Sequence, residues 1–134
     1  MSDCDPRPLL VVDAANVVGS VPDGWWRDRA GATERLRDAL APLAETGPHG
    51  GEAARWADPP FEVVLVVEGA ARRVTGSDTV RVVRAEGSGD DAIVALVRAE
   101  GTGRTCAVVT ADRGLRERVR ALGADVLGPR SVRP

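Results

Sequence analysis

Apolar residues gather in four short runs along this chain, at residues 9–12, 61–67, 80–83 and 106–109. Valine and leucine fill these runs without strict alternation with polar residues, which is typical of strands covered on both faces in a parallel sheet. A short fifth strand is expected at residues 125–127. The runs therefore predict a mostly parallel sheet of four to five strands.

Helical periodicity follows the first of these runs, in residues 32–45. The leucines there recur at spacings of four and three, which draws one apolar stripe along a helix. The stripe consists of Leu36, Leu40 and Leu43, and the charged residues expected to face outward are Arg35, Arg37 and Asp38. Pro42 should end or kink this helix near Ala41, because proline lacks the backbone N–H that a helix needs.

Two more helices are expected in the second half of the chain. Residues 90–100 form a broad apolar face from Ile93, Val94, Leu96 and Val97. Residues 112–124 carry a similar face at Leu115, Val119 and Leu122, and Gly123 closes that helix as a carboxyl-terminal cap. With a short helix or turn between the second and third strands, strands and helices alternate. This order predicts a three-layer α/β/α sandwich with right-handed crossovers.

The length of 134 residues suits one domain with a single core, so residues 1–134 are expected to form one unit. Residues 1–7 are expected to be flexible. Residues 46–60 are rich in glycine and proline and predict a mobile surface loop. The lone His49 in this loop is expected to be neither a ligand nor a base.

Composition and charge exclude several classes of protein. A net charge of -2 and a pI of about 5.4 exclude binding of nucleic acid by a global basic field, although a local arginine patch remains possible. The two cysteines are too few for a zinc site and fit a reduced, cytoplasmic protein. The chain shows no apolar signal region and no apolar run of membrane-spanning length, so no membrane partner is expected.

Acidic residues follow each of the four predicted strands. Asp13 ends the first strand, Glu68 ends the second, Asp90 and Asp91 open the helix after the third, and Asp112 follows the fourth. In an open parallel sheet these positions share the edge where ligands bind. Carboxylates gathered there would repel one another unless a hard divalent cation such as Mg²⁺ or Mn²⁺ neutralised them. Such a site is suited to phosphodiester hydrolysis.

Each acid also has a simpler interpretation. Asp90, Asp91 and Asp112 are each individually more typical of helix caps, and Glu68 alone suits an exposed turn. Asp13 is the hardest to explain in that way, because an acid that ends a buried strand is costly unless it is paired or bound to a metal. Asn16 suits two roles equally: a cap of the turn after the first strand, or a group that orients Asp13 or a metal-bound water.

Arginines near these acids are candidates for phosphate binding. The four candidates are Arg27, Arg72, Arg73 and Arg113. Trp25 and Trp26 lie beside the first of them and suit either a base-stacking surface or, more commonly, a core anchor. All 18 basic residues are arginine, so this composition alone explains some of the arginines near the acids.

Four motifs, in order, resemble the NYN family of PIN-like nucleases, and in particular its small YacP-like bacterial branch. They are "VVDAANVVGS", "LVVEGAA", "GSGDDAIV" and "VVTADRGLRERV", and the resemblance as a whole extends from Leu9 to about Leu127. The resemblance implies a PIN-like α/β/α fold and a ribonuclease that uses Mg²⁺ or Mn²⁺. The family's site residues fall on Asp13, Asn16, Glu68, Asp90 with Asp91 beside it, and Asp112. Relatives commonly carry aspartate at the position of Glu68.

Other α/β proteins with acids at this edge fit less well. A phosphoacceptor receiver needs a lysine, and the chain has none; a haloacid-dehalogenase-type phosphatase needs a second aspartate where Ala15 stands. The expected function is a metal-dependent ribonuclease with RNA as its partner. The alternatives are a catalytically weak module that binds RNA or a protein, and a nucleotide pyrophosphohydrolase at the same acids. A homodimer is also possible.

Overall fold

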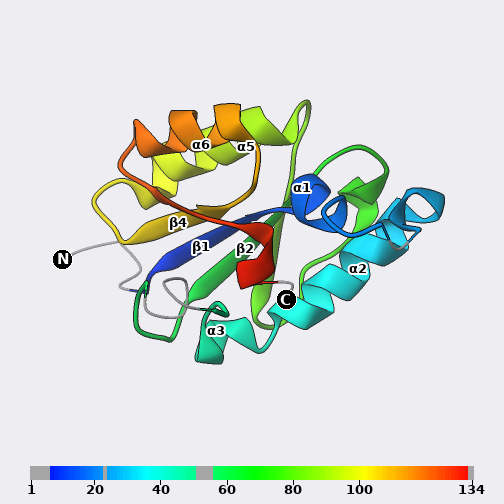
Figure 1. Cartoon of the computed structure of the whole chain (residues 1–134), viewed down its shortest axis with the longest axis horizontal. Coiled ribbons are helices and arrows are strands. Elements are labelled where there is room, and N and C mark those ends of the chain that lie inside the picture. Colours follow the sequence, from blue (N-terminus) through cyan, green and yellow to red (C-terminus); the bar gives the residue numbers. More distant parts are fainter. Residues whose placement is uncertain (1–6, 23, 51–55, 133–134) are drawn as a thin grey trace.

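A sheet of five parallel strands lies at the centre of the molecule (Figure 1). The computed structural model describes residues 7–22, 24–50 and 56–132. The strands are β1 (Leu9–Asp13), β2 (Glu62–Val67), β3 (Val80–Arg84), β4 (Cys106–Val109) and β5 (Asp125–Leu127). They lie side by side in the order β3-β2-β1-β4-β5. The predicted parallel sheet is confirmed, and every predicted strand end falls within one residue of the observed one.

Helices cover both faces of this sheet and complete the expected three layers. One face carries α5 (Gly89–Leu96) and α6 (Arg113–Arg120), and the other carries α1 (Ala14–Val18), α2 (Arg29–Leu40) and α3 (Leu43–Thr46) (Figure 1). Shorter turns connect them: η1 (Trp25–Arg27), η2 (Gly69–Arg73), the π-helical η3 (Val97–Gly101) and η4 (Pro129–Ser131). The α/β/α sandwich is therefore confirmed.

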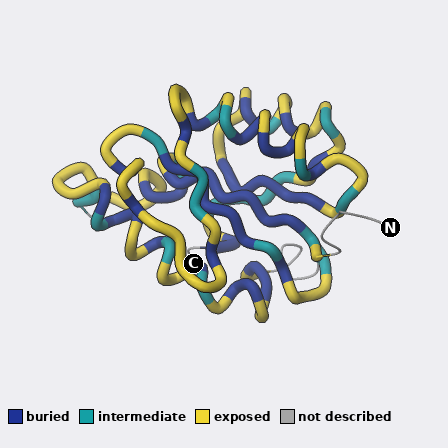
Figure 2. The backbone as a smooth tube through the Cα atoms, turned by 180° about the vertical axis from the view of Figure 1, so that it is seen from behind, coloured by how far each residue is buried: buried dark blue, intermediate teal, exposed yellow. Residues whose placement is uncertain are grey.

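Alternate residues of β1 point into two separate cores. Leu10 and Val12 pack with the α1–α3 side, whereas Leu9 and Val11 pack with α5 and α6. The burial of the central strands is visible in Figure 2. Coverage on both faces is only partial for β3: Val80 is buried, and Val82 and Val83 pack half-buried against the two cores. The reason is that β3 lies at the edge of the sheet.

Local capping decides where the helices begin and end. The Asp28 carboxylate accepts a hydrogen bond from the Gly31 N–H at 2.9 Å, so α2 begins earlier than its apolar stripe predicts. The helix stops at Leu40, and a new turn starts after Pro42, as expected. Arg37 does not face outward as predicted: it is half-buried and donates to the Thr75 carbonyl at 2.9 Å. The helix α1, directly after β1, was not predicted.

The glycine- and proline-rich segment is anchored at its carboxyl end. Trp56 stacks on Phe61 with ring centroids 5.6 Å apart, and its indole N–H donates to Asp125 at 2.9 Å. Residues 51–55, and most of the predicted flexible amino-terminal segment, lie outside the described residues. Within the described ranges, no helix is long and apolar enough to cross a membrane.

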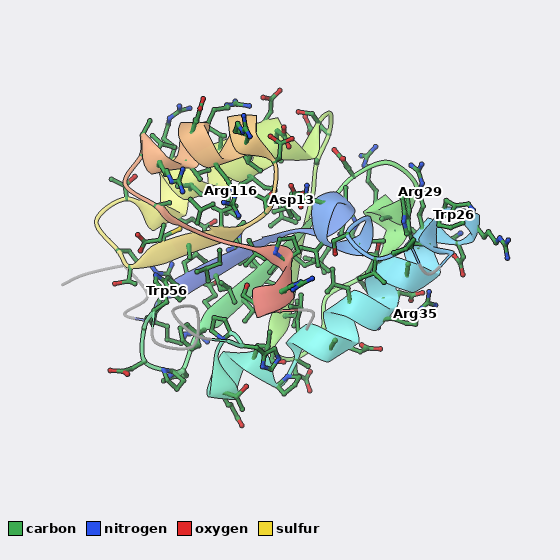
Figure 3. All side chains as sticks on the ribbon, viewed as in Figure 1. Asp13, Trp26, Arg29, Arg35, Trp56 and Arg116 are labelled. Atoms are coloured by element: carbon green, nitrogen blue, oxygen red, sulfur yellow. The ribbon has the colours of Figure 1, made fainter. Side chains whose placement is uncertain are left out.

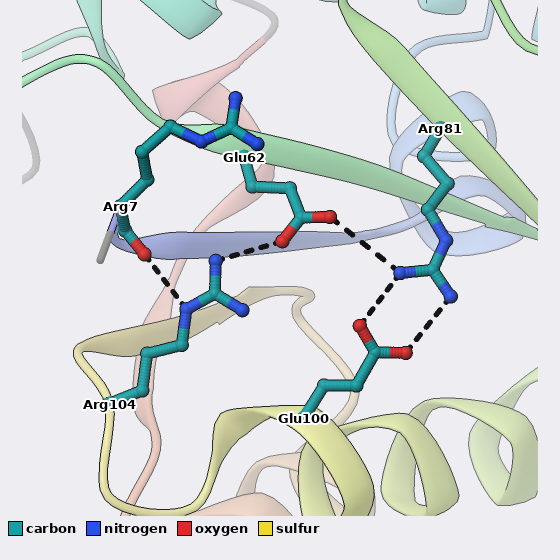
Figure 4. Close-up of polar contacts among 5 residues, drawn as sticks. All are labelled: Arg7, Glu62, Arg81, Glu100 and Arg104. Carbon is teal, nitrogen blue, oxygen red and sulfur yellow. Dashed lines mark hydrogen bonds and ion pairs between the residues drawn. The ribbon is translucent and has the colours of Figure 1, made fainter. Parts of the chain in front are cut away.

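A network of ion pairs joins the amino ends of the strands, at the opposite end of the sheet from the predicted acids (Figure 4). Glu62, the first residue of β2, accepts from Arg104 at 2.8 Å and pairs with Arg81 at 3.6 Å. Arg81 binds both carboxylate oxygens of Glu100. Glu62 is thus held between two arginines, and its side chain is only 18% exposed.

We expect Glu62→Gln to destabilise the fold, because the loss of the charge weakens both arginine contacts and leaves the 8%-exposed Arg104 side chain without its carboxylate. The free energy of unfolding should fall by about 1–3 kcal/mol, as measured by urea unfolding. The exposed Glu34→Gln is the matched control and should change it by less than about 0.5 kcal/mol. Equal effects of the two variants would contradict a structural role for this network.

Candidate active site

The direction of winding reverses between β1 and β4, at the middle of the sheet. From β1 the chain adds β2 and β3 on one side, and it later adds β4 and β5 on the other. Connections that leave neighbouring strands in opposite directions open a crevice at their carboxyl ends, which is where ligands bind in open α/β sheets. Asp13 is the last residue of β1, and Thr110 comes directly after β4. The two residues lie at this reversal, on neighbouring strands.

Asp13 is an acid buried at the end of the central strand, with only 6% of its surface exposed. The Thr110 hydroxyl donates to its Oδ2 atom at 2.9 Å, and its Oδ1 atom lies 3.5 Å from the Asn16 N–H. The pKa of Asp13 is raised to about 6, mainly by burial and, to a smaller extent, by the nearby charges of Asp90 and Glu68. The hydrogen bonds from Thr110 and Asn16 lower the pKa but do not offset the burial.

Thr110 links two of the predicted acids, although the sequence did not single it out. It is completely buried; its hydroxyl donates to Asp13 and accepts the Asp112 N–H at 3.1 Å. Its backbone carbonyl accepts from the Arg116 guanidinium at 2.8 Å. A hydroxyl residue directly after the buried "CAVV" strand was the available signal.

Asn16 connects α1 with the loop that follows β4. Its side-chain oxygen accepts the Ala111 N–H at 2.8 Å, while its own N–H lies near Asp13. This bond ties α1 to the loop that carries Asp112, a role that neither sequence-based interpretation included. Asn16 therefore positions the loop, and its side chain is directed at the backbone of Ala111.

Glu68 and Asp90 bring two more carboxylates to the same edge. The Glu68 carboxylate accepts the Gly89 N–H, at the start of α5. Gly89 leaves room for this contact, since a Cβ atom there would lie 2.9 Å from Oε2 of Glu68. The pKa of Asp90 is raised, first by burial and then by the charges of Asp112 and Glu68; Arg118 lowers it. Glu68 is therefore close enough to Asp90 for its charge to raise the pKa of Asp90.

Asp112 and Asp91 both lie at helix starts but differ in orientation. Asp112 caps α6, with Oδ1 accepting the Leu115 N–H at 2.9 Å. Asp91 is 75% exposed and accepts a hydrogen bond from Arg118 at 3.0 Å. The charges of both residues raise the pKa of Asp90, Asp112 more than Asp91, and Asp91 is also held by an arginine of α6. Among the described residues, no three acidic, histidine or cysteine side chains converge closely enough to hold a metal ion.

The candidate phosphate-binding arginines are all exposed: Arg27, Arg72, Arg73 and Arg113. Arg113 is the first residue of α6, directly after Asp112. Arg27 and Arg73 border a shared hollow of about 550 Å³, together with Trp26. Figure 3 places Trp26 beside the beginning of α2, on the far side of α1 from Asp13. Trp26 is 52% exposed, whereas Trp25 is half-buried against the core.

Two crystal structures of Rae1 (YacP) from Bacillus subtilis have this architecture. One superposes with a TM-score of 0.67 and 20% sequence identity, and covers 93% of this chain and 71% of that one. The other, of a mutant, has a TM-score of 0.67 and 19% identity, over 94% and 72% of the two chains. This chain has the YacP fold. The PIN-like architecture implied by the motifs is confirmed. No protein-family model matches the chain, and no curated protein matches it by sequence.

The raised pKa of Asp13 predicts a pH-dependent stability. The folded protein binds this proton more tightly than the unfolded chain, in which the pKa is about 3.9. Ionisation of Asp13 therefore destabilises the YacP fold as the pH rises from about 4 to the folded pKa of about 6. In EDTA at about pH 7, Asp13→Asn should be more stable than the wild type by about 1–3 kcal/mol.

Urea unfolding of both proteins across this range measures the effect. The difference should shrink steadily as the pH falls towards about 4, where Asp13 is protonated in both states of the wild type. If the difference in unfolding free energy between the two proteins does not change with pH, the pKa of Asp13 is not raised by burial.

Thr110→Val tests the link between Thr110 and Asp13, because valine keeps the shape and removes the hydroxyl. We expect the free energy of unfolding to fall by about 1–3 kcal/mol, because Asp13 and the Asp112 N–H each lose a partner. The pKa of Asp13, followed by NMR titration, should rise further. The exposed Thr105→Val is the control and should leave that pKa unchanged. If the pKa of Asp13 is the same in Thr110→Val as in the wild type, the hydrogen bond between Thr110 and Asp13 is contradicted.

Proposed function

We propose that this protein is a divalent-metal-dependent ribonuclease that hydrolyses RNA phosphodiester bonds at the carboxylates of Asp13, Glu68, Asp90 and Asp112. The observation that carries the proposal is the buried Asp13 at the winding reversal, with other acids raising its pKa. Negative charge concentrated at a ligand-binding edge is stable when a cation neutralises it. The YacP fold supports a nuclease-like function, because it is the fold that the resemblance of the four motifs to NYN nucleases implies.

The available donors fit Mg²⁺ or Mn²⁺, because all of them are carboxylates. Asp13 and Asp90 would hold the ion, with Glu68 and Asp112 beside them. Mg²⁺ commonly keeps several waters and uses only one or two carboxylates, so the lack of three convergent donors in the described chain is compatible with this ion. Asp91 would join only after release from Arg118. When bound, the ion supplies a Lewis acid that activates water and neutralises charge on the phosphate.

The residues of the chain orient this site. Thr110 holds Oδ2 of Asp13, which leaves Oδ1 with only the longer contact to Asn16. Asn16 fixes the loop before Asp112, and the Gly89 N–H fixes Glu68. These contacts prepare the carboxylates before substrate binds, which reduces the reorganisation needed for catalysis. Exposed arginines bind the phosphates of the strand: Arg27, Arg72, Arg73 and Arg113.

Cleavage of a labelled single-stranded RNA in Mn²⁺ tests the proposal directly. The wild type should cleave it, and Asp13→Asn and Asp112→Asn should each lower the rate by at least ~100-fold. Asp78→Asn, which changes an exposed acid in the loop before β3, is the matched control and should keep the wild-type rate. Thermal unfolding with and without Mn²⁺ provides a second readout, because an ion that binds the folded state must stabilise it.

Three other results would contradict the proposal. Identical trace cleavage by the wild type and the two site variants would assign that cleavage to a contaminant. RNA binding without cleavage would identify a binding module with an inactive site. Release of pyrophosphate from free nucleotides, with no RNA cleavage, would identify a nucleotide pyrophosphohydrolase. The cytoplasmic location stays a prediction.

A further inference from the structure

A hollow of about 390 Å³ lies directly beside the acidic edge. Glu68 and Gly69 form the side nearest the acids, and α1 contributes Ala14, Ala15 and Val18. Trp25 forms another side. The volume falls in the range of about 300–1,000 Å³ found for small-molecule sites. The hollow is thus large enough for a flat organic group and shares Glu68 with the candidate active site.

We propose that this hollow binds an unpaired nucleobase of the RNA strand, next to the phosphate at the acidic edge. The inference rests on the proposed ribonuclease function and narrows its substrate to RNA that is single-stranded at the cleavage site. A paired base cannot enter, because its edge and both faces are already occupied within the duplex. Recognition of RNA commonly uses such splayed bases, which stack on aromatic rings or on arginine guanidinium planes.

Trp25 and Arg29 supply the stacking surface. The Arg29 guanidinium lies over the Trp25 ring, 5.4 Å from its centroid, and both residues line the hollow. Trp26 contacts Trp25 edge to face, with centroids 5.9 Å apart. Trp25 also packs on the core, so its indole is held in place before any ligand binds. A fixed aromatic surface gains stacking energy with little loss of side-chain entropy.

The polar groups around the hollow favour stacking over recognition of one particular base. Thr33 lines the hollow, but its hydroxyl donates to the Arg29 carbonyl at 2.7 Å, and the Glu68 carboxylate already accepts the Gly89 N–H. The α1 side is formed by alanine and valine side chains, which have no hydrogen-bonding groups. We therefore expect all four bases to bind with similar affinity, as in proteins that hold single strands by stacking.

Charge around the hollow is complementary to a nucleic acid strand. Arg29 borders both this hollow and the neighbouring one of about 550 Å³, which is also lined by Arg27 and Arg73. None of these three arginines forms an ion pair with another residue in the described part of the chain. Their charges are available to phosphates on one side of the base. On the other side of the hollow, Glu68 lies next to the acids that would hold the cation.

Equilibrium binding without catalysis tests the inference. The full-length chain in EDTA is titrated into a labelled six-nucleotide single-stranded RNA, and fluorescence anisotropy gives the Kd. The same RNA with one internal abasic nucleotide, placed in turn at each internal position, serves as the second probe. At one position the missing base should weaken wild-type binding by roughly 5- to 100-fold, the usual range for loss of one stacked base.

Ala15→Leu fills the hollow without removing any group, because Ala15 is exposed on α1 and lines it. Leucine is a good helix former, so the variant should fold, which thermal unfolding checks. Its Kd for the intact RNA should rise by the same factor as the wild-type Kd rises when the base is removed. Binding of the abasic RNA to Ala15→Leu should be little weaker than either change alone produces. Ala39→Leu, on the exposed side of α2, is the matched control and should bind like the wild type.

The outcomes separate this inference from the proposed function. The base site is disproved if the wild type binds every abasic RNA as tightly as the intact RNA and Ala15→Leu binds the intact RNA as tightly as the wild type does. This holds even if the protein cleaves RNA. If base-dependent binding is found but no cleavage occurs in Mn²⁺, the base site stands and the ribonuclease proposal fails. Tighter binding of a fully paired duplex than of the single strand would also overturn the base site.

Discussion

The burial of a carboxylic acid at the end of the central strand is the constraint on which the rest of the site depends. Asp13 lies where β1 has neighbours on both sides and α1 begins at once, so water has little access to it. The hydrogen bond from Thr110 compensates only part of the lost hydration, as the raised pKa shows. The nearest charged groups that act on Asp13 are other acids. The fold therefore maintains a local excess of negative charge at its ligand-binding edge.

The two ends of the sheet handle charge in opposite ways. At the amino ends of the strands, acids and arginines alternate in space, and Glu62 lies between two guanidinium groups. At the carboxyl ends, acids gather, and the hydrogen bonds they accept come mainly from hydroxyl and backbone groups. The first arrangement stabilises the sheet on its own. The second concentrates negative charge that the described side chains offset only in part, through the effect of Arg118 on Asp90, as is common at functional sites.

Much of the fold was accessible from the sequence because buried parallel strands leave continuous apolar runs. The strand ends placed Asp13, Glu68, Asp90 and Asp112 on one edge, and in the structure the neighbouring acids raise the pKa of Asp13 and of Asp90. The short α1 was missed because "AANVV" directly continues an apolar strand.

Contacts between distant segments were less accessible from the sequence. The link between Thr110 and Asp13 joins residues 97 positions apart. Sequence spacing carries no information about this contact. Asp91, which shared every sequence feature of Asp90, turned to Arg118 because neighbouring residues of a helix face different directions.

The contact between Glu68 and Gly89 has a consequence for sequence variation. The longer glutamate side chain reaches across to the start of α5, where a Cβ atom at position 89 would lie 2.9 Å from Oε2 and the carboxylate would have to shift. An aspartate at position 68 would be one methylene shorter and would leave more space for a side chain at position 89. These two positions should therefore covary among homologous chains, with glycine favoured beside glutamate and larger residues more common beside aspartate.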